Sequence, residues 1–277
     1  MEHLLPDLVR ITAAAGEAIL QVYSSDFAVQ TKSDESPLTQ ADLASHRVIV
    51  EGLAEIAPEI PVLSEESVPP EYAVRSQWDR YWLVDPLDGT KEFVNRNGEF
   101  TVNIALIEGQ RARLGVVGVP TQNIVYTGDA DAGEALRIDL ADTQAAPQAL
   151  TGRSWDDPGS LVVVASRSHG GERLERYLED LALRFGEVAR TPVGSSLKLC
   201  ILAEGRADIY PRLGPTSEWD IAAAHAVLSA AGGDVWAAGG ASITYNAKES
   251  FLNPEFIAVA DASFDWKGSL PDVPPKE

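Results

Sequence analysis

The sequence predicts an α/β protein made of two layered halves, for three reasons. Amphipathic helical patterns open the chain, and strand-like apolar runs dominate the rest of its first half. Strand and helix patterns then alternate through the second half. Between the halves, residues 141–159 are rich in Ala, Gln, Asp, Gly and Pro, which is typical of a connection. We therefore expect an N-terminal α+β half over residues 1–150 and a C-terminal α/β half over residues 151–277.

The first half begins with two predicted helices. Apolar residues recur at helical spacing from Leu4 to Val22. A second amphipathic stretch runs from about Thr39 to Ala57, and Thr39 and Asp42 have the spacing of a capping box. Strand-like apolar runs follow at residues 60–63, 81–84, 100–107, 114–119, 124–127 and 135–138.

The second half alternates strands and helices. Its predicted elements are a strand at 161–165, a helix at 172–185, a helix opening at 194–198, a strand ending at 210–212, a helix at 218–231 and a strand at 256–260. Gly232 and Gly233 end the helix that begins at Glu218, because glycine favours helix termination. No internal repeat interrupts this order.

Composition indicates a globular protein of ordinary kind. The chain has 277 residues, of which 45% are hydrophobic, enough for a substantial core. No stretch approaches the roughly 18 consecutive apolar residues of a membrane span. Glu2 and Asp7 lie where a secretory signal would be basic, and Cys200 is a lone thiol among apolar neighbours. We expect a cytoplasmic protein, with peripheral attachment to the inner membrane as the alternative.

The charge balance restricts the binding partners. Lys and Arg number 22 against 42 Asp and Glu, which gives a net charge of −20. Such a surface repels nucleic acid, whose binding depends on neutralising phosphates. A site for a small anionic substrate must therefore supply positive charge locally, through metal ions and a few placed bases. Nothing in the composition selects an oligomeric state.

The motif D-P-L-D-G-T, at residues 85–90, follows the apolar run 81–84. It places two carboxylates three residues apart, a Leu87 carbonyl between them, and the Thr90 hydroxyl just after Gly89. Glycine allows a ligand to approach the backbone and tolerates positive φ. Hard oxygen donors at this density suit Mg²⁺. On its own, however, the motif is also compatible with a turn at a strand end.

Three other acidic positions accompany this motif. Glu65 and Glu66 follow the apolar run 60–63, Asp220 lies in the first turn of a predicted helix, and Asp42 lies in another. Each has a structural explanation of its own, as a strand-end turn, a complement to the helix dipole or a capping box. Their common chemistry and their order along the chain are not explained in this way.

Together these segments resemble the inositol monophosphatase superfamily of Mg²⁺-dependent, lithium-sensitive phosphatases. The markers are the acid pair at 65–66, D-P-x-D-G-T at 85–90, and W-D followed by small residues at 219–223. The resemblance is closer to the bacterial 3′(2′),5′-bisphosphate nucleotidases of the CysQ type, because Lys91-Glu92-Phe93 follows the motif. It covers nearly the whole chain and implies the five-layer α-β-α-β-α sandwich of the sugar phosphatases.

The resemblance also implies a metal site with two or three Mg²⁺ ions. Asp85 bridges two ions; Glu65 and the Leu87 carbonyl complete one, and Asp88 with Asp220 complete the other. Bringing Asp220 to Asp85 requires the two halves to meet, so the site is expected in the cleft between them.

Water activation is assigned by the same resemblance to a Thr–Asp pair that matches Thr90 and Asp42, with Glu65 taking part through its metal. The amides of Gly89 and Thr90 are expected to face the phosphate. The substrate phosphate therefore contacts the metal-site residues Glu65, Leu87, Asp88, Gly89, Thr90 and Asp220. The lone cysteine, Cys200, has apolar neighbours and no P-loop is present, so neither a cysteinyl phosphoenzyme nor P-loop nucleotide binding is indicated.

A nucleoside bisphosphate carries a second phosphate that the metal ions do not reach. Lys198, Arg212 and the helix start at Ser195 offer cations and donors for it. His169, with Arg167 nearby, could contact the nucleoside. The alternative is that these bases lie on a solvated face.

Three functions follow as hypotheses. The first is conversion of adenosine 3′,5′-bisphosphate to AMP and phosphate, and possibly the same reaction on 3′-phosphoadenylyl sulfate, in sulfate assimilation. The second is an inositol or sugar monophosphatase, which shares the metal site but has no need of Lys198 and Arg212. The third is a regulatory binding protein of the same superfamily.

Overall fold

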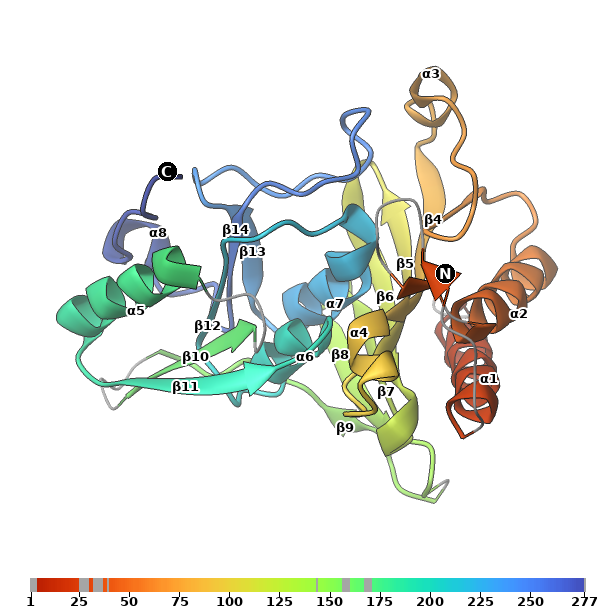
Figure 1. Cartoon of the computed structure of the whole chain (residues 1–277), viewed down its shortest axis with the longest axis horizontal. Helices are drawn as coiled ribbons and strands as arrows, with labels where there is room; N and C mark the ends of the chain where they lie inside the picture. Colours follow the sequence, from red (N-terminus) through yellow and green to blue (C-terminus); the bar gives the residue numbers. More distant parts are fainter. Residues whose placement is uncertain are drawn as a thin grey trace.

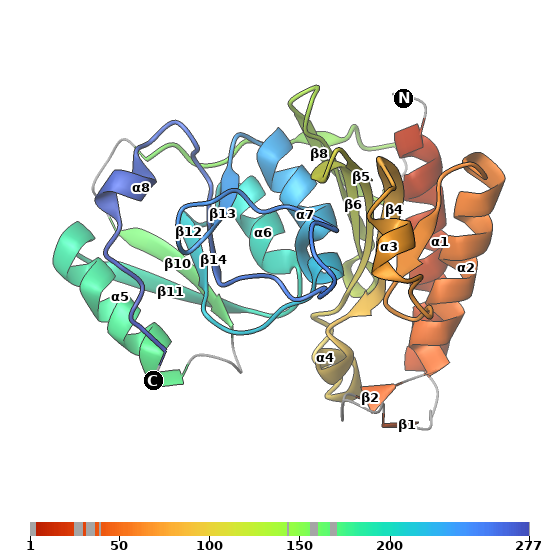
Figure 2. The same cartoon turned by 90° about the horizontal axis from the view of Figure 1, so that it is seen from above.

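The chain forms alternating layers of helices and sheets. The computed structural model describes residues 4–24, 30–31, 37–38, 40–142, 144–155, 160–166 and 171–276. Figure 2 shows the order of the layers as helices, sheet, helices, sheet, helices. The helices, from the outer layer of the first half to that of the second, are α1 (Leu4–Tyr23) and α2 (Gln40–Ile56), then α7 (Glu218–Ala230) and α6 (Leu197–Ala203), then α5 (Gly171–Phe185) and α8 (Trp266–Ser269). The predicted five-layer sandwich is confirmed.

The sheet of the first half has seven strands in sequence order. They are β3 (Val62–Ser64), β4 (Arg80–Asp88), β5 (Thr101–Glu108), β6 (Arg111–Val119), β7 (Ile124–Asp129), β8 (Glu134–Asp139) and β9 (Gln148–Ala149). β3 pairs with β4 in parallel, and every later neighbour is antiparallel. The short elements of this half are β1 (Gln30–Thr31), β2 (Pro37–Leu38), α3 (Tyr72–Arg75), α4 (Thr90–Val94) and the 3₁₀ turn η1 (Pro120–Gln122).

The sheet of the second half has five strands in the order β11-β10-β12-β14-β13. Their bounds are β10 (Leu161–Ser166), β11 (Val188–Val193), β12 (Ile209–Arg212), β13 (Asp234–Ala237) and β14 (Phe256–Val259). β10 is parallel to β11 and β12, whereas β14 is antiparallel to β12 and β13. Figure 1 shows this sheet beside α6 and α7, on the side away from α1 and α2.

Helix α7 joins the two halves. It packs on β5, β6 and β7 of the first sheet, although its residues come from the second half of the sequence. Gly115 and Gly128 allow this approach: a Cβ at Gly115 would lie 2.0 Å from the Ala223 carbonyl oxygen, and one at Gly128 would lie 2.4 Å from Val227 Cα. Because the helix start carries Asp220, these two glycines help to place that carboxylate beside the first half.

Most predicted elements are present with ends shifted by a few residues, but one expectation is wrong. The strand expected to end at Val84 continues to Asp88, with a register shift between Asp85 and Asp88. Pro86 lies inside this irregularity, where its missing N–H costs no regular ladder bond. The segment 141–159, expected to connect the halves, includes in its described part the short strand β9, which pairs with β8. Within the described residues, no helix is long and apolar enough to cross a membrane.

Candidate active site

The predicted metal turn lies at the end of β4. Asp85 is 1% exposed, and its Oδ1 accepts a hydrogen bond from the Leu87 amide at 3.1 Å. Gly89 has φ 91° and precedes α4, so the left-handed turn needs a residue without a side chain. The Thr90 hydroxyl, in the first turn of α4, donates to the Leu87 carbonyl at 3.4 Å. The positive φ expected of this glycine is confirmed, and its close approach to a ligand stays a prediction.

The neighbouring strand places Glu65 beside Asp85. β3 is parallel to β4 with Ser64 opposite Val84, and the Glu65 amide donates to the Val84 carbonyl at 3.1 Å. The two acids therefore leave adjacent parallel strands at the same edge of the sheet. This is where side chains from parallel strands converge.

Helix α2 supports both strand ends from outside the sheet. Asp42 is buried in its first turn, and the Ser45 hydroxyl donates to the Pro86 carbonyl at 2.7 Å. Nδ1 of the next residue, His46, lies 2.9 Å from the Ser64 hydroxyl. The capping partner predicted for Asp42, Thr39, lies outside the described residues.

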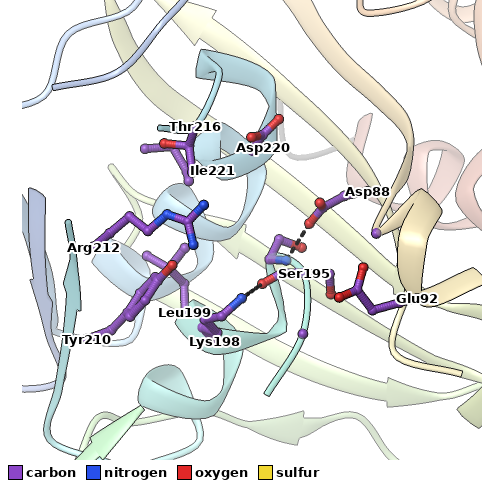
Figure 3. Close-up of a pocket in the computed structure, with 13 residues that line it drawn as sticks. Asp88, Glu92, Ser195, Lys198, Leu199, Tyr210, Arg212, Thr216, Asp220 and Ile221 are labelled. Atoms are coloured by element: carbon purple, nitrogen blue, oxygen red, sulfur yellow. Dashed lines mark hydrogen bonds between the residues drawn. The ribbon is translucent and has the colours of Figure 1, made fainter. Parts of the chain in front are cut away.

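Asp220 comes from the second half, in the first turn of α7. Its Oδ2 accepts the Ser217 amide at 2.9 Å and completes a capping box. The sequence placed Asp220 in the first helical turn as a complement to the helix dipole; the capping box is an additional structural role, and it uses only one carboxylate oxygen. Figure 3 shows Asp220 on the Asp88 side of the cavity, with Arg212 on the other side.

Burial and mutual repulsion raise the pKa values of the carboxylates in this acid cluster. Burial, followed by the charges of Glu65, Asp88, Asp220 and Asp42, raises the pKa of Asp85 well above its usual range. Burial and then Asp88 raise the pKa of Asp220 to about 8. Burial also raises the pKa of Asp88 to about 6, although the Lys198 charge acts in the opposite direction. Hence the acids predicted from sequence lie close enough to repel one another.

The donors suit a hard divalent cation by their chemistry. Buried carboxylates and a backbone carbonyl are the ligands that Mg²⁺ and similar ions prefer. As the side chains stand, no three His, Cys, Asp or Glu groups of the described residues are arranged to hold an ion. One oxygen of Asp220 accepts the Ser217 amide, and one oxygen of Asp88 accepts the Ser196 amide. The residues fit a metal site in the type of their donor atoms.

A buried polar network behind Asp88 is a feature that the sequence analysis missed. The Thr101 hydroxyl lies 2.8 Å from that of Ser196, which donates to Asn103 Oδ1 at 2.8 Å. Thr101 also donates to Asp88 Oδ2 at 3.5 Å. The signal was present in the sequence as two polar residues, at i and i+2, on one face of an otherwise apolar strand.

A cavity of about 110 Å³ adjoins the acid cluster. Six residues predicted from the sequence line this cavity, so the structure brings them together: Asp88, Gly89, Ser195, Lys198, Arg212 and Asp220. Its other lining residues are Glu92, Gly194, Ser196, Leu199, Tyr210, Thr216 and Ile221. Of the remaining predicted residues, His169 and Arg167 lie outside the described part of the chain.

The two bases of the cavity have few partners. Lys198 is 5% exposed, and its ammonium donates to the Ser195 carbonyl at 2.8 Å and lies 5.6 Å from the centre of the Tyr210 ring. Burial lowers the pKa of Lys198 to about 8, although the Asp88 charge opposes this shift. Arg212 donates from one terminal nitrogen to the Pro215 carbonyl at 2.8 Å, and its buried Nε has no partner among the described residues. The cavity thus holds unused donors suited to an anion.

Comparison with known proteins gives consistent matches. A sequence model of the inositol monophosphatase family matches residues 1–262. The 3′(2′),5′-bisphosphate nucleotidases CysQ of Shigella flexneri and Escherichia coli (strain K12) are each 48% identical over 255 residues, which is 91% of this chain and 98% of theirs. The protein of the same name from Buchnera aphidicola is 38% identical over 268 residues, covering 93% and 94%.

Solved structures agree with this similarity. CysQ from Bacteroides thetaiotaomicron, described as a bacterial member of the inositol monophosphatase family, matches with a TM-score of 0.80 and 41% identity over 93% of this chain and 98% of that one. An inositol monophosphatase from Thermotoga maritima has a TM-score of 0.72 over 94% and 92%, but at 21% identity it supports the fold alone.

Proposed function

Because the chain belongs to the inositol monophosphatase family, whose members are generally metal-dependent phosphatases, we propose that it is a Mg²⁺-dependent 3′(2′),5′-bisphosphate nucleotidase. Its proposed reaction converts adenosine 3′,5′-bisphosphate to AMP and phosphate. The observation that carries the proposal is the cavity beside the acid cluster, in which Lys198 and Arg212 face Asp88 and Asp220. The names of the relatives that are 48% identical support the same activity.

In this proposal Glu65, Asp85, Asp88, Asp220 and the Leu87 carbonyl hold the ions. When bound, the ions neutralise the carboxylates and supply the Lewis acidity for attack of water on the phosphoryl group. Ser45 and the Leu87 amide fix the turn, since they bond the Pro86 carbonyl and the Asp85 carboxylate. The ligands are thereby held on strand ends, which limits the reorganisation needed in the reaction.

The protein groups next to the phosphoryl group have separate tasks. The Thr90 hydroxyl would orient the attacking water, the Asp42 carboxylate would polarise that hydroxyl, and the amides of Gly89 and Thr90 would donate to the phosphate. Burial excludes bulk water around Asp42 and Asp85, each 1% exposed, which strengthens these electrostatic interactions.

The uncleaved phosphate is assigned to Lys198 and Arg212. A cation–phosphate contact is stronger than a neutral hydrogen bond, and Arg offers a planar fork. In a chain with a net charge of −20, two bases in one cavity make an anion site where the rest of the surface repels anions. The same cavity is proposed to take 3′-phosphoadenylyl sulfate, whose 5′ side is also anionic. A cytoplasmic location stays a prediction.

The test is phosphate release by the full chain in Mg²⁺ from adenosine 3′,5′-bisphosphate, inositol 1-phosphate and fructose 1,6-bisphosphate. The bisphosphate should have a kcat/KM at least about tenfold higher than inositol 1-phosphate, since one charge-assisted contact is worth about 1.5–3 kcal/mol. Equal or better use of inositol 1-phosphate would favour the monophosphatase hypothesis. Absence of turnover on all three would favour the regulatory one.

A further inference from the structure

Hydrogen bonds between the two halves lie on either side of the acid cluster, near the end of β4 and before its beginning. The first is the contact of the Ser196 amide with Asp88, near the end of β4. The second lies before the beginning of β4, in the connection from β3 that contains α3. The last residue of α3, Arg75, is 2% exposed and reaches into the segment between β13 and β14. Figure 1 shows this segment extending toward α3.

Arg75 makes an extensive set of contacts for a residue in an irregular connection. Its guanidinium donates to the Asn246 side-chain oxygen and to the carbonyls of Lys248 and Glu249. In return, Asn246 Nδ2 donates to the Arg75 carbonyl at 2.6 Å. The guanidinium carbon also lies 4.2 Å from the centre of the Phe251 ring. Such a reciprocal, planar arrangement is specific to arginine.

The same segment is bonded directly to the start of α7. Glu218, which is fully buried, accepts the Asn246 amide at 2.7 Å. The Glu218 amide donates to the Phe251 carbonyl at 2.8 Å, and the Trp219 ring lies 5.0 Å from that of Phe251. Asn246 has φ 55°, a left-handed conformation that lets one residue present its amide to Glu218 and its side chain to Arg75.

We infer that Arg75, Asn246 and Glu218 form a clamp that positions Asp220 against the acids of the first half. Glu218 lies two residues before Asp220 in the same helical turn, so the clamp fixes the turn that carries the ligand. Glu65 directly follows β3 and Asp85 lies in β4, and these are the two strands that the α3 connection joins. The clamp thus links, through one buried path, the segments that supply the ligands of the proposed metal site.

Arg75 touches neither the cavity nor the acid cluster, and it acts through other residues. Its loss should therefore weaken metal binding and leave substrate contacts intact. Residues that orient metal ligands are typically worth about 10- to 100-fold in metal affinity. Because Arg75 acts through two intermediate residues, we expect the lower end, a weakening of about tenfold. Excess metal should restore turnover, with little change in the KM for the nucleotide.

The experiment measures Mn²⁺ binding to the full chain by electron paramagnetic resonance, independently of any substrate. The matched control is Arg113→Ala, which removes another mostly buried arginine, bonded to Asp129 and Asp131 on the first sheet. We expect Arg75→Ala to bind Mn²⁺ about tenfold more weakly and Arg113→Ala to bind as wild type does. Thermal unfolding of both variants accounts for general destabilisation.

A second variant, Asn246→Ala, keeps Arg75 and the backbone bond to Glu218 but removes the two side-chain bonds between Asn246 and Arg75. It should also weaken Mn²⁺ binding, and it provides the test should Arg75→Ala fail to fold. Wild-type affinity in either folded variant, or equal weakening in Arg113→Ala, overturns the inference. The inference rests on the proposed metal site, and the two fail differently. If the wild type binds no Mn²⁺, the proposed function fails; if it binds Mn²⁺ and the clamp variants bind equally well, only the clamp fails.

Discussion

Removal of the cavity bases tests the substrate proposal at the residues that distinguish it. Lys198 and Arg212 both line the cavity, and among the described residues their charged groups donate to the Ser195 and Pro215 carbonyls, not to a carboxylate. Alanine at either position should remove one charge-assisted contact to the second phosphate, worth about 1.5–3 kcal/mol. This corresponds to a loss of roughly 10- to 150-fold in kcat/KM for adenosine 3′,5′-bisphosphate.

The substrate itself supplies the control for this loss. Adenosine 3′-monophosphate has the same scissile ester and the same base, but it lacks the phosphate assigned to the two residues. Its kcat/KM should change less than about threefold, or about 0.6 kcal/mol, in Lys198→Ala and Arg212→Ala, because it lacks the phosphate that the two bases are proposed to contact. The assay is initial-rate phosphate release on both substrates, in saturating Mg²⁺ and at constant ionic strength.

A further control separates charge from position. Arg80→Ala removes one positive charge from the chain, but Arg80 is bonded to Glu108 at the far end of β4 from Asp88. It should leave both substrates unaffected. If the bisphosphate and the monophosphate decline in parallel in the Lys198 and Arg212 variants, the two bases support the fold, and the assignment of the second phosphate is refuted.

Three other predictions concern the acid cluster and its neighbours. Asp85→Asn should lose more than nine-tenths of the turnover, and activity above a tenth of wild type in a rate assay would refute the bridging role of Asp85. Without metal, the variant should unfold no more easily than wild type, because a neutral amide replaces a buried carboxyl whose pKa is raised. Li⁺ and Ca²⁺ should each inhibit the Mg²⁺-supported rate, since Ca²⁺ has a larger and looser shell, and a rate indifferent to both in a competition series would speak against the mechanism. The KM for the bisphosphate should rise between pH 7 and pH 9. The pKa of Lys198 is lowered to about 8, so its ammonium group loses its proton and its charge as the pH rises through that value. A pH profile of KM equal to that of the 3′-monophosphate would contradict this.

The parts of the fold that the sequence predicted well are those with a regular period. α1 and α2 follow apolar residues at helical spacing, and Gly232 follows the end of α7 as expected. The strand that ends in Asp88 was predicted too short, because Pro86 suggested a turn and the irregular register that accommodates it leaves no pattern in the sequence.

The candidate site was predicted as a set of residue types, and its assembly needed the structure. Asp220 approaches the first half because Gly115 and Gly128 allow α7 to lie against the sheet. The sequence does not show which element packs against a glycine in a strand. The Ser196 contact with Asp88 joins residues 108 positions apart. Arg75 had no signal at all, since it lies in an irregular connection and the partners of its guanidinium hydrogen bonds lie 171 to 174 residues further along the chain.

The central claim is that one acid cluster binds the metal ions while the adjoining bases bind the second phosphate. Its most direct test is a crystal structure with Mn²⁺ and AMP, the product that retains the 5′-phosphate. We expect anomalous density for Mn²⁺ in contact with Asp85, Glu65 and Asp220, and an AMP phosphate in contact with Lys198 and Arg212. Density for Mn²⁺ away from Asp85, or an AMP phosphate that contacts neither base, would contradict it.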